Sequence, residues 1–241
     1  MSRRYLCVAI VGVLATAVAL SATGGAASSV RHAPNHKITN STSTNWSGYA
    51  VTGSRYTSVS ASWTEPTVSC SGGTAYSSFW VGLDGDTSGT VEQTGTDADC
   101  SGSTPQYYAW YEMYPKFPTN LSGTVRPGDN MTASVTTNGS GSFTLTISDT
   151  TQGWTNTTNA RLKHAALASA EVIAEAPSSS GGVLPLANFG TVGFTNAKAN
   201  GATLTSSTPG IDPITMQSGT TVKAQPSSIN SGSFYVAWKH S

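Results

Sequence analysis

The stretch NMTASVTTNGSGSFTLTISD, residues 130–149, contains two runs in which apolar and polar residues alternate. A period of two places the apolar side chains on one face of a β-strand and the polar side chains on the other. The tetrapeptide NGSG (138–141) between the runs is typical of a hairpin turn. The stretch therefore predicts two antiparallel strands, 130–137 and 142–149, with one face toward a core.

Similar short runs recur along the chain between clusters of Gly, Asn and Ser. They are TSVSASWTEP (57–66), YSSFWVGL (76–83), QYYAWYEMYP (106–115) and SFYVAWK (233–239). Evenly spaced short strands with such turns predict an all-β fold of the antiparallel β-sandwich type.

One segment has a different composition. ARLKHAALASAEVIAEAP (160–177) is rich in Ala, Leu and Glu, which are strong helix formers, although the residues from 167 onward also alternate. Propensity favours a helix and alternation favours a strand. Both conformations put Glu171 and Glu175 on one face, because positions i and i+4 coincide at either period. The two carboxyl groups are therefore expected to be neighbours.

Charged residues make up only 10% of the 241 residues, and the formal net charge is zero. An average soluble domain has roughly 25% charged residues. The chain has no basic stripe, so nucleic acid is not an expected partner. A polar surface with few carboxylates does not depend on their ionisation for solubility, which fits an acidic medium.

The N-terminus has the pattern of a secretory signal peptide. Arg3 and Arg4 precede an apolar run over 6–20, and small residues follow up to Ala27. Residues 1–27 are therefore expected to be removed on export, which predicts a secreted protein without a membrane anchor. Residues 28–44 are expected to form a flexible leader or short pro-segment, and 45–241 a single folded domain.

Two cysteines, Cys70 and Cys100, remain after signal removal, and they are expected to form one disulfide between loops that flank residues 79–97. The four histidines, His32, His36, His164 and His240, lack the spacing of metal ligands, so a metal site is not expected. His164 is interpreted as a surface residue.

The stretch FWVGLDGDTSGTVEQTGTD (79–97) gathers polar side chains: Trp80, Asp84, Asp86, Gln93 and Asp97. Gln does not titrate, so it is a poor acid or base. Gln93 among these carboxylic acids indicates a site that uses an uncharged hydrogen-bond donor beside a carboxyl group. Asp84 and Asp86 alone fit turn residues that bind nearby backbone N–H groups.

Other acids lie within apolar or aromatic runs, namely Glu112, Glu171 and Glu175. Each one alone fits a solvated position on a strand. Together they indicate either hydrolysis by general acid–base chemistry or carbohydrate binding on an aromatic face. A glycoside hydrolase would use a pair such as Glu112 and Glu175, separated by about 5–5.5 Å for retention or 6.5–9.5 Å for inversion. A non-catalytic sugar-binding module would need only the aromatic face.

An ordered set of motifs resembles the glutamic peptidases, or eqolisins. The motifs are NWSGY (45–49), FWVGLDGD (79–86), QTG (93–95) followed by Asp97, YYAWYEMYP (107–115), SAEVIAE (169–175) and LPLANFGTVGFTNA (184–197). The resemblance implies a secreted acid endopeptidase that acts on protein or peptide substrates as a monomer, without metal or cofactor. It also implies two curved antiparallel sheets packed as a concanavalin-like sandwich, with a strand at 167–175.

The resemblance assigns the catalytic pair to Gln93 and Glu175, with Glu171 as a neighbour. Trp80, Asp84, Asp97 and Glu112 fall where the family has residues that line or support the cleft. The long inhibitory pro-segment of fungal members has no room before residue 45.

Overall fold

The computed structural model describes residues 30–32, 41–86 and 88–241. These ranges contain eighteen β-strands and no helix, and all strand pairs but one are antiparallel, the exception being β1 with β16. The all-β, mostly antiparallel prediction is therefore confirmed. Among the described residues, no helix of sufficient length and apolar character for a membrane span is found. Residues 1–29 lie outside the described part, so the predicted signal peptide stays a prediction.

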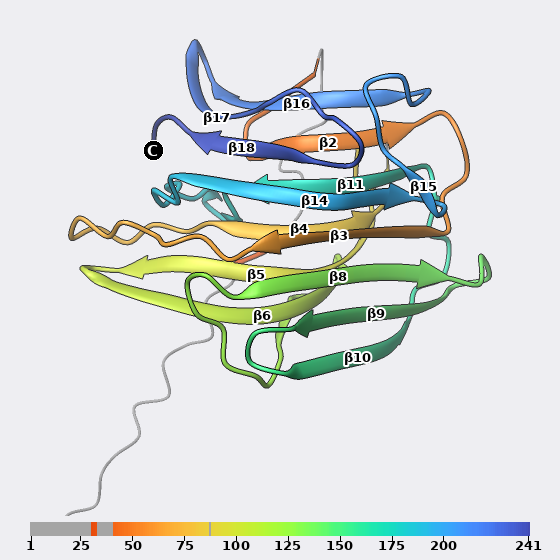
Figure 1. Cartoon of the computed structure of the whole chain (residues 1–241), viewed down its shortest axis with the longest axis horizontal. Coiled ribbons are helices and arrows are strands. Elements are labelled where there is room, and N and C mark those ends of the chain that lie inside the picture. Colours follow the sequence, from red (N-terminus) through yellow and green to blue (C-terminus); the bar gives the residue numbers. More distant parts are fainter. Residues whose placement is uncertain (1–29, 33–40, 87) are drawn as a thin grey trace, which may run out of the picture.

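Figure 1 shows two layers of strands. The front layer follows the order β10 (Trp154–Arg161), β9 (Ser142–Asp149), β8 (Asn130–Thr137), β3 (Ser58–Thr64), β14 (Thr191–Ala199), β18 (Phe234–Trp238), β17 (Thr221–Pro226) and β16 (Ile211–Ser218). The rear layer follows the order β2 (Trp46–Thr52), β11 (Ser169–Glu175), β4 (Ser78–Leu83), β5 (Val91–Ser101), β6 (Thr104–Tyr114) and β7 (Thr119–Asn120).

The two layers belong to one hydrogen-bonded sheet. Strand β16 pairs with β17 on one side and with β2 on the other, so the ladder continues from the front layer into the rear layer. Two separate sheets were predicted, whereas the structure has one continuous sheet that folds over to form both layers. Short strands complete the fold: β1 (Thr42–Ser43) on β16, β15 (Ala202–Thr203) on β14, and β12 (Ser178–Ser179) with β13 (Gly182–Val183).

Segment 160–177 forms strand rather than helix. Strand β10 ends at Arg161, and β11 begins at Ser169. Strand β11 lies between β2 and β4 and pairs with both along nearly its whole length. Its backbone groups are satisfied by two neighbours, and this tertiary environment overrides the helix propensity of Ala and Glu.

The front and rear strands differ in how they are buried. Strands β8 and β9 alternate between more and less buried residues, as their sequences predicted, and β10 alternates in the same way. Strands β4 and β11 are buried at every position, and β5 at all but the last. Strands β4, β5 and β11 of the rear layer are therefore covered on both faces, although several strands were expected to have one face in water.

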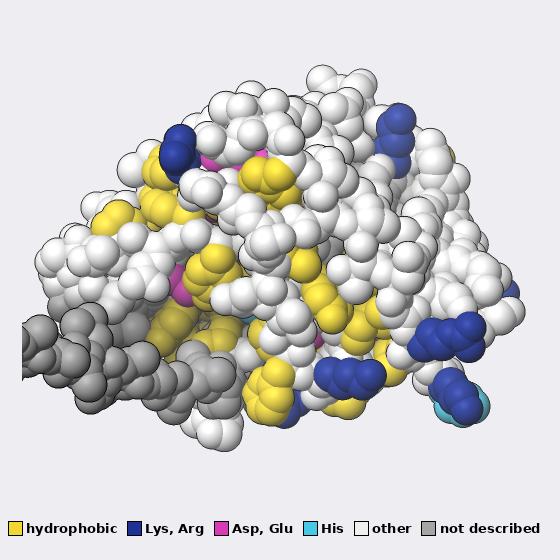
Figure 2. Space-filling view, turned by 90° about the horizontal axis from the view of Figure 1, so that it is seen from below, with side chains coloured by type: hydrophobic (Ala, Val, Ile, Leu, Met, Phe, Trp, Pro, Cys, Tyr) yellow, Lys and Arg dark blue, Asp and Glu magenta, His cyan; other side chains and the backbone are white. Residues whose placement is uncertain are grey.

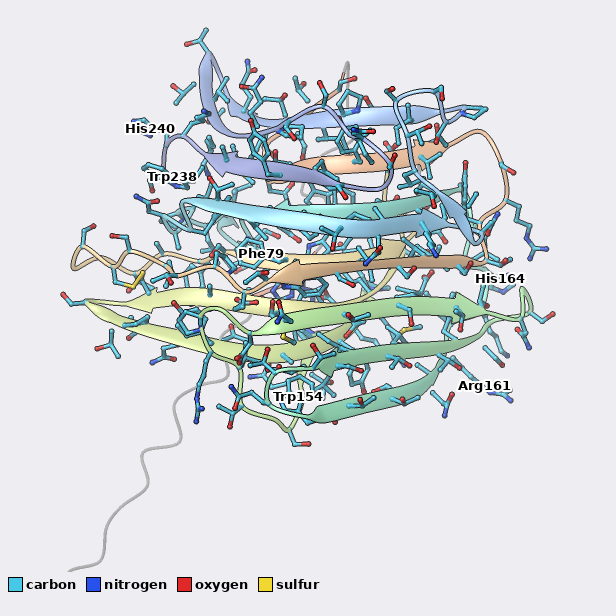
Figure 3. The ribbon with its side chains drawn as sticks, in the orientation of Figure 1. Phe79, Trp154, Arg161, His164, Trp238 and His240 are labelled. Carbon is cyan, nitrogen blue, oxygen red and sulfur yellow. A yellow bond between two sulfur atoms is a disulfide. The ribbon has the colours of Figure 1, made fainter. Side chains whose placement is uncertain are left out.

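The main core lies between the layers. Phe79, Val81 and Leu83 of β4 point into it, and Phe79 meets Phe189 edge to face (Figure 3). Each large apolar side chain buried in this way stabilises the fold by roughly 1.5–3 kcal/mol. Successive side chains of β4 point to opposite faces of the sheet, so Trp80 points away from this core. It is part of a second apolar cluster on the other face.

The predicted disulfide between Cys70 and Cys100 is present, with the two Cα atoms 5.4 Å apart. Cys100 lies within strand β5 rather than in a loop. The bond fastens the segment before β4 to the far end of β5, and it closes a loop that restricts the unfolded chain.

Two acids are buried near the core. Glu65 accepts hydrogen bonds from Trp63 Nε1 and Thr96 Oγ1, and burial raises its pKa from 4.5 to about 8. Burial and the nearby charge of Asp84 raise the pKa of Glu92 to about 8 as well. Both groups bind a proton more tightly in the folded than in the unfolded chain.

The folded protein is therefore expected to be more stable in acid than at neutral pH. The contribution of Glu65 and Glu92 is fully present below pH 4.5 and is lost as the pH rises toward 8. Thermal unfolding between these limits should give a midpoint that falls with rising pH, and Glu65→Gln should make the slope shallower. A midpoint that rises over this range would contradict the assignment.

Candidate active site

The face of the rear layer that points away from the core is lined by tryptophans. Trp46 of β2, Trp80 of β4 and Trp110 of β6 are fully buried and share an apolar cluster with Ile173 of β11. Trp46 and Trp80 meet edge to face, with ring centroids 4.9 Å apart. Polar side chains that project from this tryptophan face are therefore shielded from water.

Two glycines make room for Trp80. A Cβ atom at Gly95 would lie 2.5 Å from Trp80 Cβ and 2.2 Å from the Phe79 carbonyl oxygen. A Cβ atom at Gly82 would lie 2.9 Å from the Trp80 ring and 3.1 Å from Gln93 Cβ. The glycines of the GLDGD and QTG motifs thus leave the space that Trp80 occupies next to Gln93.

Gln93 lies on β5 directly opposite Glu112 of β6. Its side-chain Nε2 donates to Glu112 Oε2 at 3.0 Å, and its Oε1 has no hydrogen-bond partner among the described residues. Burial raises the pKa of Glu112 to about 7, although the charges of His32 and Arg31 oppose this. The hydrogen bond to Glu112 therefore fixes the orientation of the Gln93 side-chain amide.

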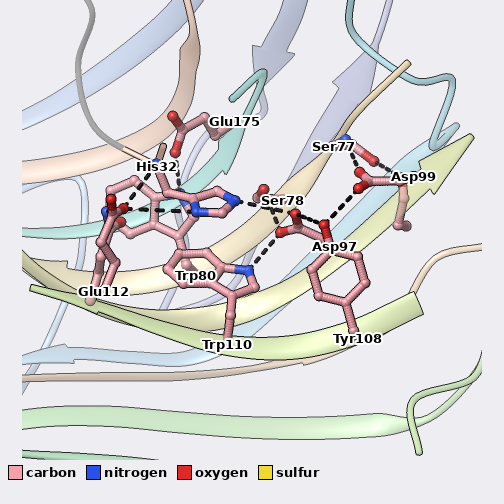
Figure 4. A network of polar contacts seen from close by, with 12 residues as sticks. His32, Ser77, Ser78, Trp80, Asp97, Asp99, Tyr108, Trp110, Glu112 and Glu175 are labelled. Atoms are coloured by element: carbon pink, nitrogen blue, oxygen red, sulfur yellow. Dashed lines mark hydrogen bonds and ion pairs between the residues drawn. The ribbon is translucent and has the colours of Figure 1, made fainter. Parts of the chain in front are cut away.

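Glu175 ends strand β11 on the same face (Figure 4). Trp80 Nε1 donates to its Oε2 at 2.8 Å, and Asn45 Nδ2 donates to its Oε1 at 3.1 Å. Burial raises the pKa of Glu175 well above its ordinary value, and the charge of Glu112 adds to this. The carboxyl group is held in place by two donors and is sensitive to the charge of its neighbours.

Asp97 supports the site from β5. Its Oδ1 accepts hydrogen bonds from Ser78 Oγ at 2.6 Å and Trp110 Nε1 at 2.6 Å, and its Oδ2 accepts from Tyr108 Oη at 2.9 Å. The supporting role expected for Asp97 is consistent with this network, which fixes the ring of Trp110.

Asp84 and Glu171 lie outside the network of Figure 4. The carboxylate of Asp84 accepts from the backbone N–H groups of Leu167 and Ala168, both at 2.8 Å. It therefore binds the segment before β11, not the nearby turn expected from its sequence. Glu171 is fully buried, and neither of its oxygens has a hydrogen-bond partner in the described part of the chain. Burial raises its pKa well above the ordinary value.

His32 joins the site, and sequence reasoning missed it. Its backbone N–H donates to Glu112 Oε2 at 2.9 Å, and its Nε2 lies 3.2 Å from Asp97 Oδ2. These partners are 80 and 65 residues away in the sequence, so no local motif indicated the contact. His164 is exposed at one end of the molecule, as interpreted from the sequence (Figure 3).

Across residues 30–32, 41–86 and 88–241, no group of three His, Cys, Asp or Glu side chains is arranged to hold a metal ion. On the face drawn in Figure 2, most of the surface is uncharged, and Lys and Arg side chains lie apart toward its edges.

Comparison with known proteins identifies the family of this fold. The model of the Peptidase A4 family matches residues 44–238. Aspergillopepsin-2 of Aspergillus niger is 35% identical over 181 residues, which cover 65% of this chain and 64% of the relative. Scytalidopepsin B of Scytalidium lignicola is 40% identical over 111 residues, which cover 45% of this chain and 41% of the relative. The matched part thus spans less than two thirds of either relative.

Solved structures of glutamic peptidases share the fold. Scytalido-glutamic peptidase with a transition state analog inhibitor superposes with a TM-score of 0.71 at 27% identity, covering 81% of this chain and 98% of that chain. Aspergilloglutamic peptidase from Aspergillus niger gives 0.61 at 28% identity, covering 68% and 99%. The family model alone covers most of the described residues. The chain belongs to the Peptidase A4 family.

Proposed function

We propose that this chain is a secreted glutamic endopeptidase that cleaves protein or peptide substrates in acid, with Gln93 and Glu175 as its catalytic pair. One observation carries the proposal. An amide that cannot ionise, that of Gln93, and a carboxyl group held by two hydrogen-bond donors, that of Glu175, project from the same tryptophan face. The peptidases among the relatives support the reaction class.

Peptide hydrolysis on this face proceeds through an activated water. Ionised Glu175 removes a proton from the water as its oxygen attacks the scissile carbonyl carbon. The carbonyl oxygen then becomes negatively charged, and Gln93 Nε2 donates a hydrogen bond to it. Protonated Glu175 returns the proton to the leaving nitrogen, and the C–N bond breaks.

Asn45 and Trp80 orient the base. Each donates one hydrogen bond to a different oxygen of Glu175, which leaves further lone pairs for the water. Donors to a carboxylate favour its ionised form and so oppose the effect of burial on the pKa. Gln at position 93 adds no negative charge near Glu175, whereas a second carboxylate there would raise its pKa further.

Glu112 accounts for the expected loss of activity toward neutral pH. It binds the amide that would stabilise the oxyanion, so its own negative charge would oppose charge development there. With a pKa of about 7, it is neutral in acid and ionises as the pH rises past neutrality. This agrees with an acid peptidase.

The catalytic pair is tested by Gln93→Ala and Glu175→Gln. Loss of an oxyanion donor should lower kcat by about 10²–10³ for Gln93→Ala, and Glu175→Gln should abolish cleavage because the base is lost. Denatured protein in acid is the substrate, and peptide products are measured by mass spectrometry. Gln106→Ala is a matched control, because Gln106 is exposed on the same strand as Glu112.

Unchanged turnover in Gln93→Ala would rule out its donor role. Cleavage retained in Glu175→Gln but lost in Glu171→Gln would move the base to Glu171. A panel of glycans in the same assay tests the glycoside hydrolase alternative, in which sugars and not peptides are released.

The donor from Trp80 is tested by Trp80→Phe. Removal of its N–H should raise the pKa of Glu175, so the acid limb of kcat/KM should move upward by about half to one pH unit. Trp46→Phe is the control, because the indole Nε1 of Trp46 has no hydrogen-bond partner within the described ranges. The same shift in both variants, or none in Trp80→Phe, would contradict the role of this hydrogen bond.

A further inference from the structure

One tyrosine hydroxyl lies between two carboxyl groups at the edge of the tryptophan face (Figure 4). Asp97 and Asp99 lie two residues apart on β5, so their side chains project from the same side of the strand. Tyr108 lies opposite Asp97 on β6. Its Oη is 2.9 Å from Asp97 Oδ2 and 2.8 Å from Asp99 Oδ2, so a single phenol contacts both carboxyl groups.

The phenol of Tyr108 has only one proton to donate. A hydroxyl group donates one hydrogen bond and accepts others, whereas an ionised carboxylate only accepts. Two ionised carboxylates would therefore compete for the same proton, and the one left without it would face the lone pairs of the phenol oxygen. Both contacts are hydrogen bonds only if one of the two carboxyl groups is protonated and donates to Tyr108.

The surroundings place that proton on Asp99. Asp97 accepts hydrogen bonds from two further side chains, among them Trp110 Nε1 at 2.6 Å, and such donors favour the ionised form. Within the described ranges, the Asp99 carboxyl group has one other hydrogen bond besides the contact with Tyr108. The backbone N–H of Ser77 donates to its Oδ1 at 3.1 Å. The Oδ2 atom of Asp99 is therefore the one that carries the proton and donates it to Tyr108.

Burial and charge favour the same assignment. Burial raises the pKa of Asp99 well above its ordinary value of 3.8, and the negative charge of Asp97 adds to this. The contacts with Tyr108 and Ser77 and the charge of His32 oppose the shift. Burial also raises the pKa of Tyr108, so the phenol keeps its proton. The titratable groups that face Asp99 are thus Asp97 of β5, Tyr108 of β6 and His32.

The backbone around Asp99 is fixed by other bonds. The next residue, Cys100, forms the disulfide with Cys70 and exchanges two backbone hydrogen bonds with Ala75. A change in the protonation of Asp99 therefore acts on its side-chain hydrogen bonds and does not need to move the strand.

The other end of this network reaches the catalytic groups. Trp110 and Trp80 lie on the two strands next to Gly95, each directly opposite it. The indole N–H of Trp80 donates to Glu175. Burial is the main cause of the raised pKa of Glu175, and the charge of Asp97 adds to it. The orientation of Asp97 therefore affects both the tryptophan wall and the base.

We propose that Asp99 is a positioning residue of this peptidase that acts as a neutral carboxylic acid. It donates to Tyr108, which then donates to Asp97, and Asp97 holds the indole of Trp110. The proposal rests on the proposed peptidase function. As the pH rises through the titration of Asp99, the proton is lost and Tyr108 no longer satisfies both carboxylates. Trp110 then loses its fixed position on the face that carries Glu175.

Two substitutions of Asp99 in the full chain test this. Asp99→Ala should lower kcat/KM on an internally quenched peptide in acid by about fivefold, as expected for the loss of one hydrogen bond. Asp99→Asn should restore most of this loss, because its amide is uncharged and donates to Tyr108 at any pH. Asp149→Asn is the matched control, because Asp149 is another carboxyl group whose pKa burial raises, on β9 of the front layer. It should follow the unsubstituted chain.

NMR of the unsubstituted chain gives a readout that needs no catalysis. With carboxyl-labelled aspartate, the signal of Asp99, assigned by its absence in Asp99→Asn, should titrate well above 3.8. The indole N–H signal of Trp110 should shift with the same midpoint, because its acceptor Asp97 loses the support of Tyr108. This shift should be absent in Asp99→Asn.

An Asp99 carboxyl group that titrates at or below 3.8 would overturn the proposal, as would equal losses of activity in Asp99→Asn and Asp99→Ala. If the NMR results hold while no variant cleaves peptide, the positioning network stands and the proposed function fails.

Discussion

Burial of carboxyl groups against tryptophan rings is the constraint on which the site depends. A carboxylate loses favourable hydration there, so Glu175 is held by an indole N–H and an amide N–H. The ring that supplies the first donor fits only because Gly82 and Gly95 lack side chains. A further carboxylate at position 93 would add to this cost, whereas Gln93 offers a donor without a charge. The glycines make room for the ring of Trp80, and the indole and the two amides supply hydrogen-bond donors to buried carboxyl groups.

Local sequence patterns predicted much of the fold. The runs at 130–137 and 142–149 form β8 and β9 with the predicted boundaries, because one face of each packs on the core and the other is polar. Composition alone favoured a helix at 160–177, and pairing of β11 with two neighbours made it a strand. The sequence could not predict that β16 joins the two layers into one sheet, because β16 pairs with β2, a strand far away in the chain.

The sequence motifs named several residues that the structure brings together on one face. Gln93, Glu112, Asp97, Trp80 and Glu175 were named from the sequence, and they project from one face because their strands pair in the register observed. Asp84 was misread as a local turn residue, since its partners are backbone groups more than eighty residues away. His32 had no signal at all. Its partners, Glu112 and Asp97, lie 80 and 65 residues away, so its place in the structure depends on the surface formed by distant strands.

A crystal structure at acidic pH with a peptide transition-state analogue tests the central claim, that one amide and one carboxyl group act on the same tetrahedral centre. The account predicts Gln93 Nε2 and a Glu175 oxygen each within about 3.2 Å of an oxygen of that centre. An analogue bound by Glu112 and Glu171 without Gln93, or bound elsewhere on the protein, would contradict it.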